Sequence, residues 1–203
     1  MNIADVTESW PVVSSSETFS SLLITVRIDK VRFPDNHLAE REVVLHPGAV
    51  AVLALDDANR ILLIRQYRHP VGRLLWEIPA GLRDVAGEEP WDTARRELAE
   101  EVGYRARDWR VLADIFSSPG FSTERLRIFL ARGLDQIPEA ERTYVPEDEE
   151  AYLLAEWVPL DEAVGKVLDG DLHNGVAALA IMAAAAARSD GFAALRAVDA
   201  PES

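Results

Sequence analysis

The 203-residue chain contains no cysteine. Disulfide bonds, thiolate metal sites and cysteine nucleophiles are therefore excluded. Positive charge is also scarce, because 35 acidic residues outnumber 21 basic ones and the formal net charge is −14. This balance argues against general binding to nucleic acid or to an anionic membrane surface. A small phosphorylated ligand is still compatible, since it needs only a local cluster of arginines, and nearly all the basic residues are arginine.

Long apolar runs are missing as well. The longest, residues 176–187, is too short and too rich in alanine to span a bilayer. The first ten residues have neither the basic start nor the apolar run of a secretory signal. We therefore expect a cytoplasmic protein that binds neither nucleic acid nor membrane.

The hydrophobic pattern predicts an antiparallel β element at the N-terminus. Residues 22–33 and 39–46 alternate apolar and polar side chains on either side of a turn at 34–36, as the two strands of a hairpin do. The Ser/Thr-rich residues 14–21 before them indicate a mobile or edge segment.

The rest of the chain favours one α/β domain. Strands are expected at 49–55, 61–67, 76–78, 109–115, 126–131 and 152–158, and helices at 90–102, 160–168 and 176–188. Helices before and after mixed strands predict an α/β/α sandwich with a mixed sheet. We expect the β element to cover residues 1–46, the α/β domain to cover 47–190, and a C-terminal tail to cover 191–203, frayed from residue 199 onwards.

Three carboxylates are expected on one side of the helix at 90–102. Glu97 and Glu101 lie four residues apart along one edge of its buried stripe, and Glu100 lies next to them. Such carboxylates repel each other unless a cation neutralises them, and Mg²⁺ prefers carboxylate oxygens. For the short acidic string alone, a solvated helix with Glu–Arg pairs is the alternative.

The residues around this helix form a longer pattern. From Glu88 to Gly103 the chain reads Glu, seven residues, Arg-Glu-Leu, one residue, Glu-Glu, one residue, Gly. This pattern resembles the signature of the Nudix hydrolases, which opens with a glycine five residues before the first glutamate. Six residues separate Gly81 from Glu88 here, and the extra residue falls in the loop before the helix.

The resemblance assigns roles to the acidic helix. It implies that Glu97 and Glu101 are the principal metal ligands, with Glu100 nearby and the backbone carbonyl of Ala80 completing the site. It also implies that Arg96 orients the glutamates. In the same way Glu88 is expected to support the loop and the helix and not to bind metal.

Beyond the signature, residues 20–185 resemble the ADP-ribose pyrophosphatase branch of the family. The matching segments are 41–44, 66–69, 75–81 and 118–122, together with His46. In this branch a proline about sixteen residues beyond the signature marks the ADP-sugar class, and Pro119 lies sixteen residues beyond Gly103.

Four residues outside the helix are implied to bind substrate. Arg68 is expected to bind the diphosphate through its planar guanidinium group. The alternative is that Arg68 is an ordinary exposed surface residue. Arg41 is a second candidate, and pairing with an acidic residue of the hairpin is its alternative. Phe121 contacts the sugar or the adenine in this interpretation, or else belongs to the core. Glu124 is a candidate for a ribose contact.

A second acidic segment, residues 146–150, precedes the strand at 152–158. A run of charge is usually a solvated loop. In the resembling branch a glutamate on this loop moves towards the metals and activates the attacking water. The alignment favours Glu150, with Glu149 as the alternative.

The resemblance as a whole implies a Mg²⁺-dependent enzyme, with Mn²⁺ as the alternative metal. It would hydrolyse ADP-ribose to AMP and ribose 5-phosphate as a homodimer that exchanges N-terminal hairpins. One alternative substrate is another nucleoside diphosphate derivative, such as a GDP-sugar or a dinucleotide. Another alternative is a non-catalytic Nudix domain that senses ADP-ribose, although such domains usually carry a degraded signature.

Overall fold

The computed structural model describes residues 3–142, 144 and 152–202. The chain forms two compact units, each described below by itself. The first contains residues 3–47 and 118–124, and the second contains 48–117 and the described part of 125–202.

The first unit is a three-stranded antiparallel sheet in the order β1-β2-β3. Its strands are β1 (Val12–Ser20), β2 (Thr25–Arg32) and β3 (Leu38–Leu45). The predicted hairpin corresponds to β2 and β3. The Ser/Thr-rich segment pairs with β2 and becomes the exposed edge strand β1, so the element has three strands and not two.

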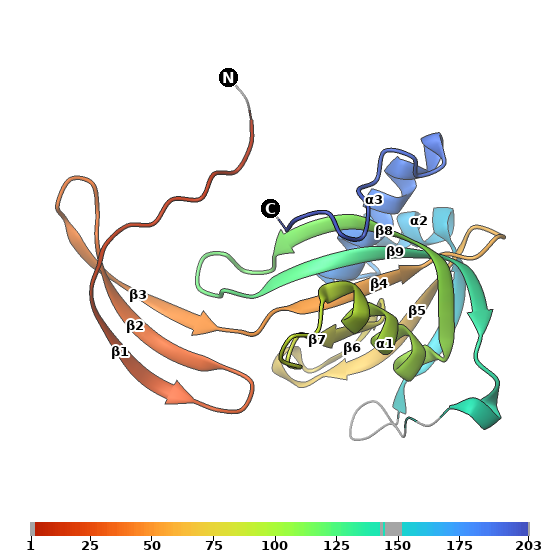
Figure 1. The fold of residues 1–203 in the computed structure, drawn as a ribbon, viewed down its shortest axis with the longest axis horizontal. Helices are drawn as coiled ribbons and strands as arrows, with labels where there is room; N and C mark the ends of the chain where they lie inside the picture. Colours follow the sequence, from red (N-terminus) through yellow and green to blue (C-terminus); the bar gives the residue numbers. More distant parts are fainter. Residues whose placement is uncertain (1–2, 143, 145–151, 203) are drawn as a thin grey trace. The chain divides into compact units, whose positions relative to one another are not determined.

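The second unit contains two sheets (Figure 1). The mixed sheet has the order β7-β4-β9-β8, with β4 (Ala49–Ala54), β7 (Ala80–Leu82), β8 (Tyr104–Phe116) and β9 (Arg125–Gln136). Its β4 and β9 run parallel, whereas its other pairs are antiparallel. The second sheet is antiparallel, in the order β10-β5-β6, with β5 (Arg60–Arg68), β6 (Arg73–Glu77) and β10 (Leu154–Pro159).

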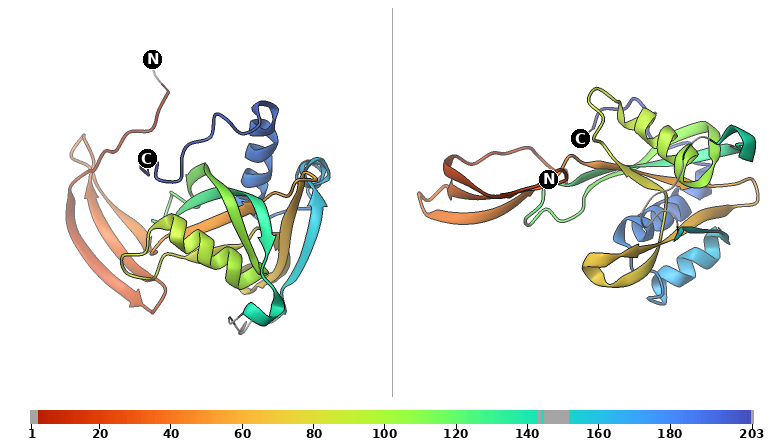
Figure 2. Two further views of the ribbon diagram at one scale, coloured as in Figure 1. Left: turned by 45° about the vertical axis from the view of Figure 1, so that its right-hand side comes forward. Right: turned by 90° about the horizontal axis from the view of Figure 1, so that it is seen from below.

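Strand β4 separates two hydrophobic cores. Because side chains alternate along a strand, Val50 and Val52 face the core that contains Leu98 of helix α1 (Pro90–Val102). Leu53 faces the core that contains Ile181 of helix α3 (Gly175–Ala187). Figure 2 accordingly shows α1 on one side of the strands and α2 (Leu160–Leu168) with α3 on the other. The predicted α/β sandwich with a mixed sheet is confirmed.

Helix α1 begins and ends where the sequence predicts. Pro90 occupies the first turn, where its missing N–H costs no hydrogen bond. Gly103 ends the helix in the left-handed conformation at a φ of 70°, which glycine adopts without steric cost. Leu98 and Val102 are buried, so the helix is held against the sheet and its acidic edge has a fixed orientation.

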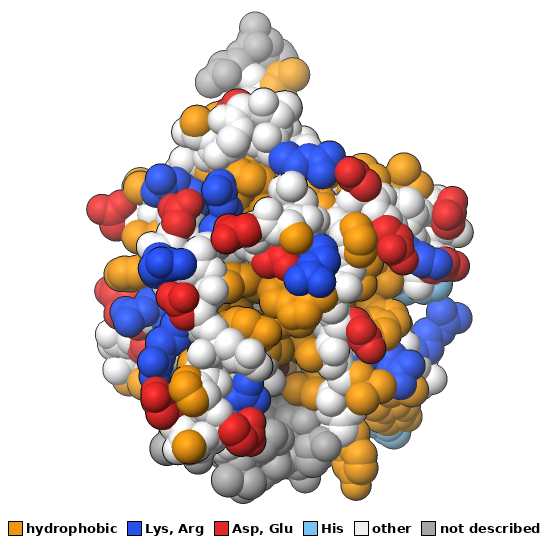
Figure 3. Space-filling model, turned by 90° about the vertical axis from the view of Figure 1, so that its right-hand side faces the viewer, with side chains coloured by type: hydrophobic (Ala, Val, Ile, Leu, Met, Phe, Trp, Pro, Cys, Tyr) orange, Lys and Arg blue, Asp and Glu red, His pale blue; other side chains and the backbone are white. Residues whose placement is uncertain are grey.

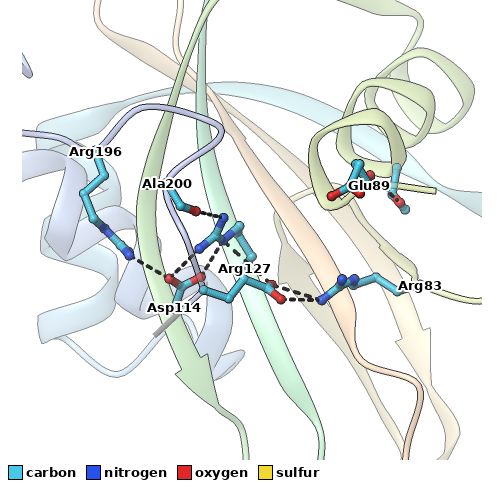
Figure 4. Close-up of polar contacts among 8 residues, drawn as sticks. Arg83, Glu89, Asp114, Arg127, Arg196 and Ala200 are labelled. Atoms are coloured by element: carbon cyan, nitrogen blue, oxygen red, sulfur yellow. Dashed lines mark hydrogen bonds and ion pairs between the residues drawn. The ribbon is translucent and has the colours of Figure 1, made fainter. Parts of the chain in front are cut away.

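The prediction that the chain frays from residue 199 onwards is wrong for the described residues 199–202. Arg127 of β9 is buried, and its guanidinium donates to the carbonyl oxygen of Ala200 at 2.7 Å. It also donates to both carboxylate oxygens of Asp114, which receives a third hydrogen bond from Arg196 (Figure 4). Glu202 accepts two hydrogen bonds from Arg83. A buried guanidinium needs acceptors, and the tail supplies one of them.

Residue 196 also extends the mixed sheet, because the amide of Val111 on β8 donates to the carbonyl of Arg196.

Among the described residues, no helix has the length and apolar character needed to cross a membrane.

Candidate active site

Helix α1 and strand β7 bring two of the predicted metal ligands to the same stretch of backbone. The carboxylate of Glu101 accepts a hydrogen bond of 3.0 Å from the backbone amide of Ala80. The carboxyl group of Glu97, one helical turn earlier, lies against the next residue, Gly81. The side chains of Glu97 and Glu101, four residues apart on α1, thus contact two successive residues of β7.

Gly81 is required for this arrangement because it has no side chain. A β-carbon at position 81 would overlap the carboxyl group of Glu97, and real β-carbons do not approach other atoms so closely. The first glycine of the signature therefore makes room for a carboxylate beside the strand. The left-handed conformation is not involved, since Gly81 has no positive φ.

Arg96 binds three acidic side chains around the helix. One of its terminal nitrogens donates to Glu97 at 2.7 Å and to Glu100 at 3.0 Å. Its other two nitrogens donate to the two oxygens of Glu88, each at 3.2 Å. Glu88 is also bound by the hydroxyl of Thr93. Arg96 and Glu88 thereby join the loop before α1 to the helix.

These pairs shift the ionisation of both partners. The hydrogen bond from Arg96 lowers the pKa of Glu88 more than burial raises it. The hydrogen bond to Glu88, with the charge of Glu97 and the hydrogen bond to Glu100, raises the pKa of Arg96 above its ordinary value, although burial opposes this. Both groups therefore stay charged across the physiological pH range.

The donor chemistry of this cluster fits a hard divalent cation. Glu88, Glu97, Glu100 and Glu101 supply only oxygen donors, and the guanidinium of Arg96 is bound to three of them. The cluster therefore has an excess of negative charge, which Mg²⁺ would offset. In the part of the chain that the structure describes, however, no three acidic or histidine side chains form a preformed metal site. Arg96 and the β7 backbone hold the carboxylates instead.

Arg68, the predicted diphosphate ligand, is positioned by a buried acid. Its guanidinium donates to both carboxylate oxygens of Glu77, at 2.9 and 2.6 Å. The side chain of Glu77 is 4% exposed, whereas that of Arg68 is 44% exposed. Glu77 thus fixes the orientation of the Arg68 guanidinium, which still reaches solvent. A planar guanidinium held in one orientation is well suited to bind a phosphate.

The other candidate substrate ligands belong to the first unit. Arg41 on β3 lies 5.1 Å from the centre of the Phe33 ring and donates to the carbonyl oxygen of Glu40. Asp29, which lies opposite Arg41 in the register, forms its ion pair with Arg27 instead. The structure therefore favours neither an acidic partner in the hairpin nor a buried role for Arg41.

Phe121 and Glu124 lie on the segment that joins β3. The side chain of Phe121 is 57% exposed, so it is not a core residue, and its carbonyl accepts from the amide of Val44. Glu124 lies 3.8 Å from the imidazole of His46. The predicted bases Glu149 and Glu150 lie outside the described residues.

The family model described as the NUDIX domain matches residues 45–178. The chain belongs to the Nudix family. Among its relatives, an ADP-ribose pyrophosphatase of Mycobacterium tuberculosis is 44% identical over 94% of this chain and 89% of the relative. An ADP-ribose pyrophosphatase of Bacillus subtilis is 36% identical over 83% of this chain and 89% of the relative.

A solved structure titled as an ADP compounds hydrolase has a similar fold. Its TM-score is 0.77, and the match covers 93% of this chain and 99% of that one at 22% sequence identity. Identity this low shows the fold alone. The Nudix family and the fold that the sequence predicts are both confirmed.

Sequence reasoning missed one residue of this Nudix site. Glu77 lies within the matching segment 75–81 and is not among the predicted site residues, although it is the buried partner of Arg68. A signal was available, because Glu77 stands between Trp76 and Ile78 in a short apolar strand, and a charge there is rarely buried unless it is paired. The sequence does not say which cation pairs with it.

Proposed function

We propose that this Nudix protein hydrolyses the pyrophosphate bond of ADP-ribose to give AMP and ribose 5-phosphate, with a divalent cation as cofactor. The observation that carries the proposal is the match, over most of the chain, to two relatives named as ADP-ribose pyrophosphatases. The acidic cluster at β7 supports it, because cleavage of a diphosphate requires charge neutralisation at the phosphate oxygens.

In this proposal Glu97, Glu101 and the carbonyl oxygen of Ala80 hold the cation, and Glu100 lies beside them. Mg²⁺, with Mn²⁺ as the alternative, offsets the charge of the diphosphate when bound and lowers the pKa of nearby water. Arg96 keeps Glu97 and Glu100 oriented from the other side through its hydrogen bonds.

The remaining residues bind and orient the substrate. Arg68, anchored by Glu77, donates to an oxygen of the diphosphate and aligns the scissile bond. Arg41, Phe121 and Glu124 contact the nucleoside and ribose parts. Water attacks one phosphorus in line, and the bond from that phosphorus to the bridging oxygen breaks, so that one phosphate leaves with each product.

The proton of the attacking water passes to Glu150, or to Glu149 in the alternative alignment. The Glu150→Gln variant should lose most of kcat while KM changes little, because an amide cannot accept this proton. Steady-state kinetics on Glu149→Gln and Glu150→Gln, made in parallel, assign the base to the variant with the larger loss. Wild-type kcat in both would remove this segment from the mechanism.

We also propose that residues 1–46 form a β element exchanged between the subunits of a homodimer, that 47–190 form the catalytic domain, and that 191–203 form its tail. The first unit supports an exchanged element because large apolar side chains are exposed on it, among them Val12, Phe19 and Leu23. Light scattering at several concentrations tests the dimer. A monomeric mass would also remove the substrate role of Arg41.

A cytoplasmic location fits this function and is likewise part of the proposal.

Product analysis tests the proposed substrate. The protein is incubated with ADP-ribose, GDP-sugars and dinucleotides at a fixed Mg²⁺ concentration, and released AMP or GMP is measured by chromatography. We expect the highest kcat/KM with ADP-ribose. A higher kcat/KM with a GDP-sugar would reassign the substrate, and no turnover of any compound would favour a sensing domain.

A further inference from the structure

A groove with four arginines lies on the side of α1 that faces β8. It has a volume of about 600 Å³, and its charged lining consists of Arg95, Arg96, Arg105, Arg107, Asp92 and Asp135. Neither Glu97 nor Glu101 lines it. The groove is therefore distinct from the acidic cluster at β7, although Arg96 contributes to both.

The spacing of these residues explains why their side chains converge. Asp92, Arg95 and Arg96 share one side of α1, because residues three and four apart are neighbours on a helix. Arg105 and Arg107 alternate on one face of β8. The helix thus forms one wall of the groove, and the first residues of β8 form the other.

The side chains that line the groove carry more positive than negative charge, although the molecule is strongly acidic. They comprise four guanidinium groups and two carboxylates, whereas the whole chain has a formal net charge of −14. The charge of Arg96 is already offset by Glu88, Glu97 and Glu100, so the positive charge available to an anion comes from Arg95, Arg105 and Arg107. Figure 3 shows Lys and Arg side chains gathered along the left of the face drawn, with acidic side chains between them. An anion approaching most of this surface is repelled, so a basic groove concentrates anions locally.

The ion pairs within the groove are weak enough to be exchanged. Arg95 lies 3.3 Å from Asp92, Arg107 lies 3.3 Å from Asp135, and Arg105 lies 3.7 Å from Glu141. All six side chains are more than half exposed. Exposed pairs of this kind contribute little to stability, and a multiply charged anion can replace the carboxylates as partner.

We propose that this groove binds an anion that carries several linked phosphate groups. Arginine suits such a ligand, because its planar fork donates two parallel hydrogen bonds to one phosphate. Arginines on facing walls, Arg95 on α1 with Arg105 and Arg107 on β8, can bind successive phosphates of one chain. The volume is also in the range of small-ligand sites. The binding is separate from hydrolysis and does not depend on the proposed substrate.

Calorimetry with inorganic tripolyphosphate in metal-free buffer tests the proposal. The test variant combines Arg105→Gln and Arg107→Gln, whose side chains are mostly exposed, so the fold should be retained. The control is Arg110→Gln, because Arg110 lies on the same strand, is also exposed at its side chain and does not line the groove. Thermal melting of all three proteins verifies folding.

We expect wild type and Arg110→Gln to bind one tripolyphosphate per chain with equal Kd, and the double variant to bind about tenfold more weakly or worse. A parallel titration with ATP, which carries three linked phosphate groups, distinguishes a nucleotide from an inorganic phosphate chain as the source of the anion. Failure of wild type to bind either probe would overturn the proposal. Equal binding by all three proteins, or an equal loss in the double variant and the control, would also overturn it.

Discussion

Individual carboxylates of the acidic cluster have different partners, and this allows their roles to be separated. Glu101 is bound by the backbone of β7, whereas Glu97 and Glu100 are bound by Arg96. A variant of Glu101 therefore removes a proposed metal ligand and leaves the contacts of Arg96 in place.

We expect Glu101→Gln to retain the fold and to lose at least about 100-fold in Mg²⁺-dependent kcat, because a neutral amide is a poor ligand for a hard cation. Circular dichroism checks the fold, and calorimetric titration with Mg²⁺ checks the metal site. Glu162→Gln, on α2, is the matched control. Near wild-type turnover of Glu101→Gln at saturating Mg²⁺ would refute the metal assignment.

The Glu77→Gln variant tests whether the buried acid acts through Arg68. An amide can accept only one of the two hydrogen bonds of Arg68 without a clash, so the guanidinium loses its fixed orientation. We expect KM for ADP-ribose to rise about tenfold while kcat falls less. Glu156→Gln on β10, in the same sheet, is the control. A pure loss of thermal stability with unchanged KM would reduce Glu77 to a structural role.

At the level of secondary structure, α1 was predictable to the residue, because Pro90, the apolar stripe and Gly103 all act locally. The sheet arrangement was not. The apolar patterns of β4 and β5 show two adjacent strands joined by a turn, yet these strands lie in different sheets. Strand partners depend on contacts distant in the sequence, such as the parallel pairing of β4 with β9, and periodicity carries no information about them.

The contact between β7 and α1 yields a prediction for Gly81. Because a β-carbon would overlap the Glu97 carboxyl group, Gly81→Ala should displace Glu97 and lower Mg²⁺ affinity at least about tenfold. The melting temperature should fall only slightly, since Gly81 has ordinary backbone angles. Gly165→Ala, where no atom lies within 4 Å of the added carbon, should leave Mg²⁺ binding unchanged. Equal affinities in the two variants would contradict the steric argument.

For the molecule as a whole, the main surprise is the C-terminal segment. Its last residues, 199–203, read Asp-Ala-Pro-Glu-Ser and show no periodicity, so the sequence predicts fraying there. The deciding residue is Arg127, which stands in an apolar strand far away in the sequence and is 3% exposed. The buried guanidinium of Arg127 needs hydrogen-bond acceptors, and the carbonyl oxygen of Ala200 in the tail is one of them. A local sequence pattern cannot show that a distant arginine will bind the tail.

The hydrogen bonds that Asp114 accepts from Arg127 and Arg196 should make the stability of the protein sensitive to acid. Burial raises the pKa of Asp114, but hydrogen bonds from Arg127 and Arg196 outweigh it, so the pKa lies below its ordinary value. The stabilisation is therefore complete above the unfolded-state pKa of about 3.9 and is lost as the pH falls through the lower folded-state value. Denaturant unfolding between pH 3 and 6 should show a steeper loss for wild type than for Asp114→Asn. Parallel curves would contradict this.

We expect a newly made chain to fold without capturing a cation, because Arg96 already balances part of the negative charge around α1. Its raised pKa keeps this internal counter-ion in place at any physiological pH. Small domains built around structural zinc behave differently, since they unfold when the metal is removed. Under the proposed function, scarcity of metal in the cell would thus leave a reserve of intact, inactive enzyme that regains activity when the ion returns.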